Sequence, residues 1–175
     1  MTQPITAVLL GAGARGHFSY GPYAQEYPDQ LKFVAVAEPN PVRRARFAQA
    51  HGISAACQFV SWEDLLAKGQ IADALFNMTQ DQTHYRSTLA AFDAGYDVLL
   101  EKPMAERLSH VVELVQTAER KGKLLQVCHV LRFSPFFSKL HEILESGRLG
   151  EIITVEHREN VLAVPLRHEH AFLCD

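Results

Sequence analysis

Apolar positions in the first 130 residues form short continuous runs, separated by longer stretches with a helical period. Continuous apolar runs are typical of strands buried on both faces of a parallel sheet. We predict six such strands, at 5–10, 31–37, 55–60, 72–77, 97–100 and 124–130. A helical period is clearest at Val111, Leu114, Val115 and Ala118, spaced i, i+3, i+4 and i+7. Since strands and helices alternate, the sequence predicts an α/β fold with a doubly wound parallel sheet.

Two of the intervening helices carry end signals. Pro41 is expected to open a helix that runs to about residue 50. Proline lacks a backbone N–H, but an N–H in the first turn of a helix has no hydrogen-bond partner within the helix, so its loss costs nothing there. Gly52 provides the stop. Ser109 is the predicted N-cap of the helix that ends at Gly122.

The pattern changes after residue 132. Ser134 and Pro135 begin a predicted helix with Phe136, Leu140 and Ile143 on one face. Residues 152–160 then alternate between apolar and polar, which predicts a half-exposed strand of an antiparallel sheet. We therefore expect two domains: residues 1–131 hold the parallel sheet, and residues 132–175 begin an incomplete α+β domain.

Composition narrows the possible partners. The 175 residues are 47% hydrophobic and 21% charged, with 17 basic and 20 acidic side chains and a net charge of −3. This balance gives no support for a nucleic acid or an anionic membrane as partner. Three widely spaced cysteines, Cys57, Cys128 and Cys174, fit neither a disulfide framework nor a zinc site. With no signal peptide or membrane-length apolar run, they predict a reduced, cytoplasmic protein.

A glycine-rich segment directly follows the first predicted strand. Gly11, Gly13 and Gly16 have the spacing G-x-G-x-x-G, and Glu38 follows 22 residues later, at the end of the second strand. In this context the motif predicts a dinucleotide site, where glycines admit the diphosphate and the acid binds the ribose hydroxyls. Its expected residues are Gly11, Gly13, Ala14, Arg15, Gly16 and Glu38. The alternative is a simple glycine turn with a solvated glutamate.

Glu38 also bears on the choice of dinucleotide. A carboxylate accepts hydrogen bonds from a free 2′-hydroxyl and repels a 2′-phosphate, so NAD is favoured over NADP. Arg43 and Arg44 follow closely and offer a phosphate contact, although a solvated helix face is the simpler explanation for them.

Lys102 lies just beyond the fifth predicted strand. Pro103 cannot donate to a ladder and ends the strand, so Glu101 and Lys102 project where ligands collect in open α/β sheets. Lys102 is either a group that orients a substrate hydroxyl and joins its proton relay, or a surface lysine paired with Glu101.

Glu101-Lys102-Pro103, with Ala-Ala-Phe-Asp-Ala-Gly at 90–95 before it, resembles the hallmark of the Gfo/Idh/MocA oxidoreductases. The glycine loop, the turn at 79–84, His129 with Arg132-Phe133, and residues 146–150 agree with that family in order. The resemblance covers roughly residues 5–160. It implies a Rossmann-type domain and NAD(P)-dependent oxidation or reduction at a hydroxyl-bearing carbon of a sugar, polyol or related compound.

The resemblance also implies roles for single residues. Lys102 is the implied catalytic lysine, and Glu101 is implied to hold it and the nicotinamide ribose. The other implied contacts are Thr79 and His84 along the cofactor, Met78 against its adenosine or ribose side, and His129 facing the nicotinamide or substrate. Simpler roles remain for two of them: His84 as a capping or packing residue, and His129 as a strand-end histidine. Pro103 is a candidate for a cis peptide.

The sequence departs from the family in its second half. Family members usually continue through a large antiparallel sheet, which supplies an Asp-x-x-x-His acid–base pair and often the subunit interface. No such motif follows residue 133 here, so we expect a truncated member. It is either an oxidoreductase or, as the alternative, a non-catalytic dinucleotide-binding module.

Two further expectations concern partners. The unpaired edge of a strand near 152 predicts a homo-oligomer formed through residues 133–160. His168 and His170 suggest a metal pair, but two histidines without further ligands are more typical of a solvated terminus, so no metal is expected.

Overall fold

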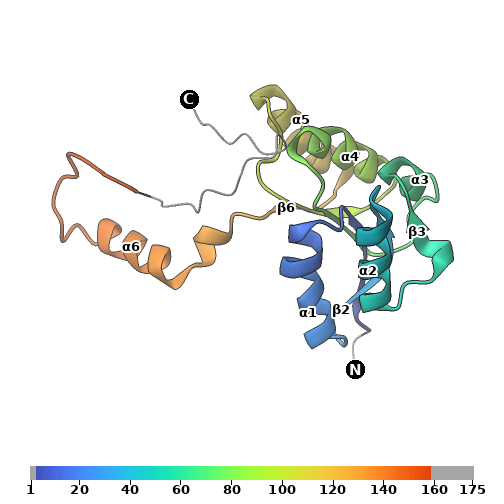
Figure 1. Ribbon diagram of the computed structural model, residues 1–175. Helices are drawn as coiled ribbons and strands as arrows, with labels where there is room; N and C mark the ends of the chain where they lie inside the picture. The colour runs from blue at the N-terminus through green and yellow to red at the C-terminus, as the bar shows by residue number, and fades with distance from the viewer. Residues whose placement is uncertain (1–2, 159–175) are drawn as a thin grey trace. The chain divides into compact units, whose positions relative to one another are not determined.

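A computed structural model of the protein describes residues 3–158. Its centre is a six-stranded sheet in the order β3-β2-β1-β4-β5-β6, in which every neighbouring pair is parallel (Figure 1). The strands are β1 (Ile5–Leu10), β2 (Leu31–Ala37), β3 (Gln58–Phe59), β4 (Ala74–Asn77), β5 (Asp97–Leu100) and β6 (Leu125–Val127). The predicted α/β fold with a doubly wound parallel sheet is confirmed.

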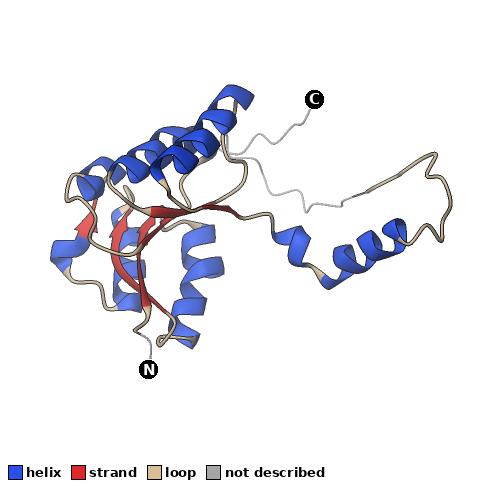
Figure 2. Ribbon diagram, turned by 180° about the vertical axis from the view of Figure 1, so that it is seen from behind, coloured by secondary structure: helices blue, strands red, loops and turns tan. Residues whose placement is uncertain are grey.

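Helices cover both faces of this sheet (Figure 2). They are the π-helical η1 (Arg15–Tyr20), α1 (Gly21–Glu26), α2 (Pro41–His51), α3 (Trp62–Leu66), α4 (Asp81–Asp93) and α5 (Leu108–Lys121). The pleat of β1 sends alternate side chains to opposite faces, so both cores take residues from one strand. Ala7 and Leu9 pack with Phe47 of α2, whereas Val8 and Leu10 pack on the side of α3, α4 and α5.

Several local expectations are confirmed. β1, β2 and β5 have the predicted bounds. α2 begins at Pro41, and Gly52 terminates it in the left-handed conformation, with φ of +65°. The peptide bond between Lys102 and Pro103 is cis.

Other elements differ from the prediction. Residues 55–57 form a 3₁₀ turn (η2, Ala55–Cys57), so β3 pairs with β2 only through Gln58 and Phe59. β6 stops at Val127, and a second 3₁₀ turn (η3, Val130–Phe133) follows. Arg107, not Ser109, is the N-cap of α5, because the backbone N–H groups of residues 110 and 111 already bond to its carbonyl.

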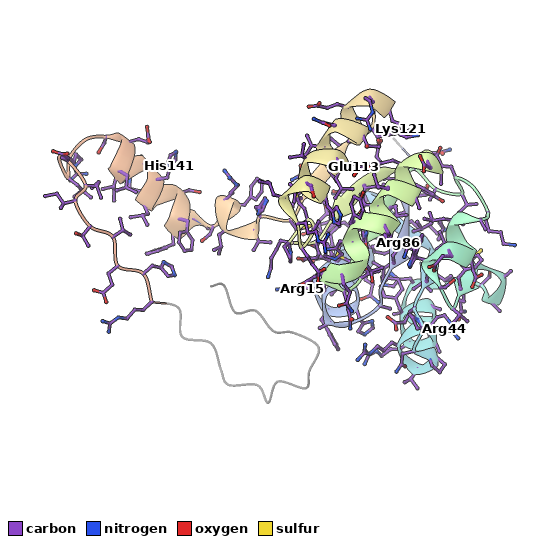
Figure 3. All side chains as sticks on the ribbon, turned by 90° about the horizontal axis from the view of Figure 1, so that it is seen from above. Arg15, Arg44, Arg86, Glu113, Lys121 and His141 are labelled. Atoms are coloured by element: carbon purple, nitrogen blue, oxygen red, sulfur yellow. The ribbon has the colours of Figure 1, made fainter. Side chains whose placement is uncertain are left out.

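The chain divides into two compact units, Met1–His129 and Val130–Asp175. The second contains α6 (Pro135–Glu145), whose His141 is labelled in Figure 3. The strand predicted at 152–160 is wrong for residues 152–158, which have no regular structure. Within residues 3–158, no strand pairs with them to complete their backbone hydrogen bonds. Asn160, His168, His170 and Cys174 lie outside the described residues.

Between residues 3 and 158, none of the helices has the length and apolar character needed to cross a membrane.

Candidate active site

The residues that follow the central strands form a row along the carboxyl edge of the sheet. Beyond each strand, one more backbone N–H donates to the neighbouring strand: Gly11 to Ala37, Met78 to Leu10, Glu101 to Asn77 and Cys128 to Leu100, at 2.8–3.0 Å. This ladder brings together segments that are up to 117 residues apart in sequence. It aligns the glycine loop, the 78–80 turn, the Lys102 segment and the end of β6.

The glycine loop fits a closely approaching ligand. Gly11 has φ of +86°, and a Cβ there would lie 2.4 Å from the Met78 carbonyl oxygen. A Cβ on Gly16, which is buried, would lie 2.3 Å from the Gly11 carbonyl oxygen. Gly13 has no neighbour within 4 Å of such an atom. Protein packing thus requires the first and third glycines, while the second leaves open space.

Glu38 lies at the end of β2 and closes one side of this loop. Its carboxylate is buried and accepts hydrogen bonds from the backbone N–H groups of Ala12, at 2.8 Å, and Asn40, at 2.9 Å. Arg44 of α2, labelled in Figure 3, donates instead to the backbone carbonyl oxygens of Glu38 and Pro39. Arg43 is exposed on α2.

The turn after β4 is fixed by a buried amide. Asn77 is fully buried; its side-chain N–H groups donate to the hydroxyls of Ser87 and Thr88, at 2.8 and 3.0 Å. Its side-chain oxygen accepts the Thr79 hydroxyl at 2.7 Å. Met78 packs into the core on the α2 side, so its carbonyl, not its side chain, is the part nearest the glycine loop.

His84 connects that turn to the Lys102 segment. The ring is buried in the first turns of α4, with Nδ1 2.7 Å from the Pro103 carbonyl oxygen and Nε2 3.1 Å from the Thr79 carbonyl oxygen. The structure thus places His84 between two segments of the site, where it fixes their separation.

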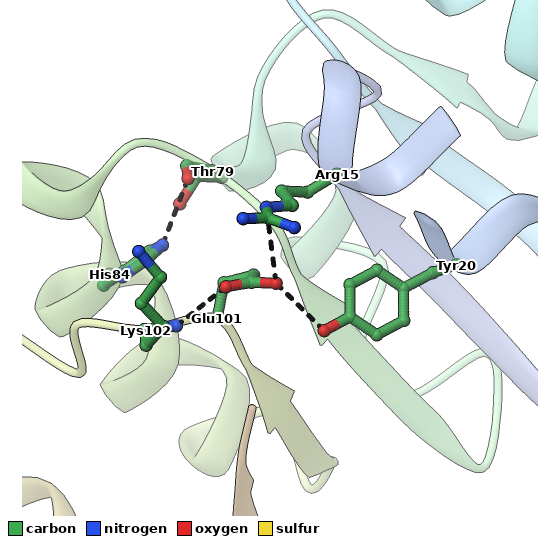
Figure 4. A network of polar contacts seen from close by, with 6 residues as sticks. All are labelled: Arg15, Tyr20, Thr79, His84, Glu101 and Lys102. Carbon is green, nitrogen blue, oxygen red and sulfur yellow. Dashed lines mark hydrogen bonds and ion pairs between the residues drawn. The ribbon is translucent and has the colours of Figure 1, made fainter. Parts of the chain in front are cut away.

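Glu101 is the centre of the polar network in Figure 4. It is buried, and its Oε2 accepts a hydrogen bond from the backbone N–H of Lys102 at 3.0 Å. Its Oε1 accepts the Tyr20 hydroxyl at 3.0 Å and lies 3.9 Å from Arg15 Nε. The side chain of Lys102 is exposed, as are Ala14 and Arg15 of the glycine loop.

His129 follows Cys128 at the end of β6 and is exposed. β6 is the strand next to β5, with Val127 opposite Leu100. The structure therefore places His129 and Lys102 beyond the ends of neighbouring strands.

Tyr20, Asn77 and Cys128 are site residues that the sequence did not indicate. Burial, the adjacent Cys128 thiol and Glu101 together raise the pKa of the Tyr20 hydroxyl, so it stays protonated and donates to Glu101. Burial also raises the pKa of Cys128. Tyr20 and Glu101 are 81 positions apart, so no local spacing connects them. Asn77 differed from its neighbours only as a polar residue ending an apolar run.

The fold and this edge define a dinucleotide-binding α/β domain. The family described as "Oxidoreductase family, NAD-binding Rossmann fold" matches residues 5–129. The chain therefore belongs to the Gfo/Idh/MocA oxidoreductases, as the resemblance implied.

Individual relatives agree with this assignment. Trans-1,2-dihydrobenzene-1,2-diol dehydrogenase of Macaca fascicularis is 34% identical over 134 residues, which is 75% of this chain and 39% of that protein. Inositol 2-dehydrogenase of Corynebacterium glutamicum (strain R) is 29% identical over 163 residues, covering 87% and 44%. The WlbA dehydrogenase of Bordetella pertussis, solved with NADH and UDP-GlcNAcA, has a TM-score of 0.76 and 27% identity, covering 86% and 43%. The chain thus spans less than half the length of these proteins.

Proposed function

We propose that this protein transfers a hydride between the nicotinamide of NAD and a CH–OH carbon of a sugar, polyol or related small molecule. The proposal rests chiefly on one observation: the backbone ladder from Gly11 through Met78 to Glu101 sets an open glycine loop beside the Lys102 segment. The names of the two relatives, which describe oxidation of a diol and of inositol, support this substrate class.

The proposed diphosphate position is the space in front of Gly13. The backbone there is unobstructed, and Arg15 supplies a cation within the loop itself. Backbone N–H groups at such a loop favour an anion. When bound, the nicotinamide supplies the hydride acceptor or donor. Thr79 and Glu101 are the proposed contacts along its nicotinamide half, with His84 holding their segments in place.

NAD is the proposed dinucleotide, with NADP disfavoured. Glu38 presents a buried carboxylate beside the loop, where a 2′-phosphate would add a second anion. Arg44 is engaged with two backbone carbonyls and would have to leave them to reach such a phosphate.

Lys102 is the proposed catalytic residue. It would orient the substrate hydroxyl and move its proton, and His129 is the second proposed group facing the nicotinamide or substrate. Support comes from their positions beyond adjacent strands, where open α/β sheets bind ligands.

Lys102→Ala tests this role. We expect NADH fluorescence titration to give a dissociation constant within about threefold of the unsubstituted protein, while turnover of the best polyol falls at least about 100-fold. Lys68→Ala, at an exposed lysine after α3, is the control and should leave both values unchanged. Unchanged turnover in Lys102→Ala would contradict the assignment.

The alternative is a module that binds the dinucleotide without chemistry. It would need only the open glycine loop and the buried Glu38, both of which lie in the first unit. Binding of NADH without turnover of any polyol would support this alternative, whereas no binding of NADH or NADPH would contradict both functions.

The proposed location is the cytoplasm. Two of the three cysteines, Cys57 and Cys128, are free thiols, as expected in a reducing compartment.

A further inference from the structure

Arg15 and Tyr20 approach the same oxygen atom of Glu101 because the segment between them is a π-helix. The Gly21 N–H donates to the Gly16 carbonyl, an i to i+5 hydrogen bond that replaces the usual i to i+4 bond. Residues five apart, such as Arg15 and Tyr20, are thereby brought toward one face. Both side chains point at Glu101 Oε1 (Figure 4).

The contacts of Tyr20 and Arg15 with Glu101 differ in strength. The Tyr20 hydroxyl donates at 3.0 Å, and its ring packs edge-on against Phe76 with centroids 6.0 Å apart. The Arg15 side chain is 57% exposed, and its Nε lies 3.9 Å from the carboxylate, at the outer limit of an ion pair. A contact this long, to a guanidinium that is mostly in solvent, contributes little to stability. Tyr20 is therefore a fixed partner of Glu101, and Arg15 a replaceable one.

We propose that Arg15 exchanges partners when a dinucleotide binds, leaving Glu101 for the diphosphate, and that Tyr20 is the positioning residue that holds Glu101 in both states. This inference rests on the proposed dinucleotide site. Because the Lys102 backbone N–H donates to Glu101 Oε2, the inference also connects occupancy of the glycine loop to the backbone of the proposed catalytic residue.

The exchange makes dinucleotide affinity depend on Tyr20 only when Arg15 is present to leave Glu101. While Tyr20 is present, departure of Arg15 leaves Glu101 Oε1 hydrogen-bonded. Without the Tyr20 hydroxyl, the same departure would leave one oxygen without a hydrogen bond on a side chain that is only 7% exposed. An unsatisfied buried acceptor is costly, so Arg15 would then be held at Glu101 and the diphosphate would bind less tightly.

A double-mutant cycle on NADH affinity tests this coupling. Tyr20→Phe keeps the ring on Phe76 and removes only the hydroxyl; we expect it to weaken NADH binding about tenfold. Arg15→Gln removes the exchanging cation. In the Arg15→Gln background, we expect Tyr20→Phe to weaken NADH binding less than about twofold. The arginine that would have to leave Glu101 is then already absent. A purely structural role for Tyr20 predicts the same loss in both backgrounds.

A second measurement needs no substitution. In ¹⁵N–¹H spectra of the labelled protein, ADP carries the diphosphate without the nicotinamide. ADP should shift both the Arg15 Nε–H and the Lys102 backbone N–H resonances, while adenosine should shift neither. An unchanged Lys102 resonance with saturating ADP would overturn the proposal even if Tyr20→Phe failed to fold.

The outcomes separate this inference from the function on which it rests. NADH binding with additive effects of the two substitutions overturns the exchange alone. A complete lack of NADH binding by the unsubstituted protein overturns the proposed function, and the exchange with it.

Discussion

The three glycines of the loop, Gly11, Gly13 and Gly16, are required for different physical reasons, although they are equivalent positions in the motif. Gly11 needs its positive φ and the close Met78 carbonyl, and Gly16 needs contact with the Gly11 carbonyl. Gly13 alone borders open space. Substitutions in this loop should therefore affect protein stability and ligand binding to different degrees.

We expect Gly16→Ala to lower both the thermal midpoint and NADH affinity, since its Cβ would lie 2.3 Å from a backbone oxygen. Gly13→Ala meets no protein atom within 4 Å, so its thermal midpoint should stay within a few degrees while NADH affinity falls at least about tenfold. Thermal melts and fluorescence titrations of the two variants provide the comparison. Equal NADH affinity in Gly13→Ala and the unsubstituted protein would contradict the proposed diphosphate position.

Residue chemistry was predictable where a local motif encodes it. Glu38, Glu101 and Lys102 were found because each follows an apolar run at a strand end, and the structure places them on one edge. Tyr20 was missed because its function depends on a π-helical turn and on a partner 81 positions away. Neither feature leaves a periodic signal in the sequence.

At the scale of elements, α2 and η1 enclose two histidines among aromatic rings. His51 packs against Phe33 and Phe47, with ring centroids 5.3 and 4.2 Å apart. Burial, and then the neighbouring His17, lower the pKa of His51 below its usual 6.5. Burial, and then Arg46, lower the pKa of His17 in the same direction. Folding therefore favours the neutral form of both rings.

This arrangement predicts a loss of stability on mild acidification. With lowered folded-state pKa values, the unfolded chain binds more protons than the folded protein as the pH falls below about 6.5, so stability decreases there. His51→Phe keeps a ring between Phe33 and Phe47 and should reduce the fall in thermal midpoint between pH 7 and pH 5. His141→Gln, at an exposed position on α6, is the control. An identical pH profile for His51→Phe and the unsubstituted protein would contradict this account.

Element bounds were predictable in the centre of the sheet and less so at its edges. β1 and β4 each have a neighbouring strand on both sides, and continuous apolar runs identified them. The one difference is that β4 begins at Ala74, two residues after the predicted start. β3 and β6 are edge strands: apolar residues 55–57 form a 3₁₀ turn, and after the last ladder bond, from Cys128, the chain turns at 130–133. Apolar character alone cannot separate these uses, because pairing depends on the neighbouring strand.

For the whole molecule, the two units differ in how they use apolar side chains. The first has buried cores on both sides of its sheet. Among described residues 130–158, none is buried. This segment leaves large apolar side chains exposed: Val130, Leu131, Phe133, Phe136, Leu140, Leu144, Leu149, Ile152, Ile153 and Val155. Such a concentration is typical of a surface that another chain covers.

Self-association through this segment stays our prediction, now based on its exposed apolar side chains and not on a strand edge. We expect the sedimentation coefficient of the 175-residue protein to rise with concentration. The 175-residue double variant Phe136→Glu/Leu140→Glu should show that rise only at higher concentration, because both side chains lie exposed on α6. A protein ending at His129 should remain monomeric and keep its thermal midpoint, since both cores lie within residues 7–118. If the 175-residue protein stays monomeric at every concentration, the prediction is contradicted. A large fall in the thermal midpoint of the shortened protein would instead reveal that residues 130–175 stabilise the sheet.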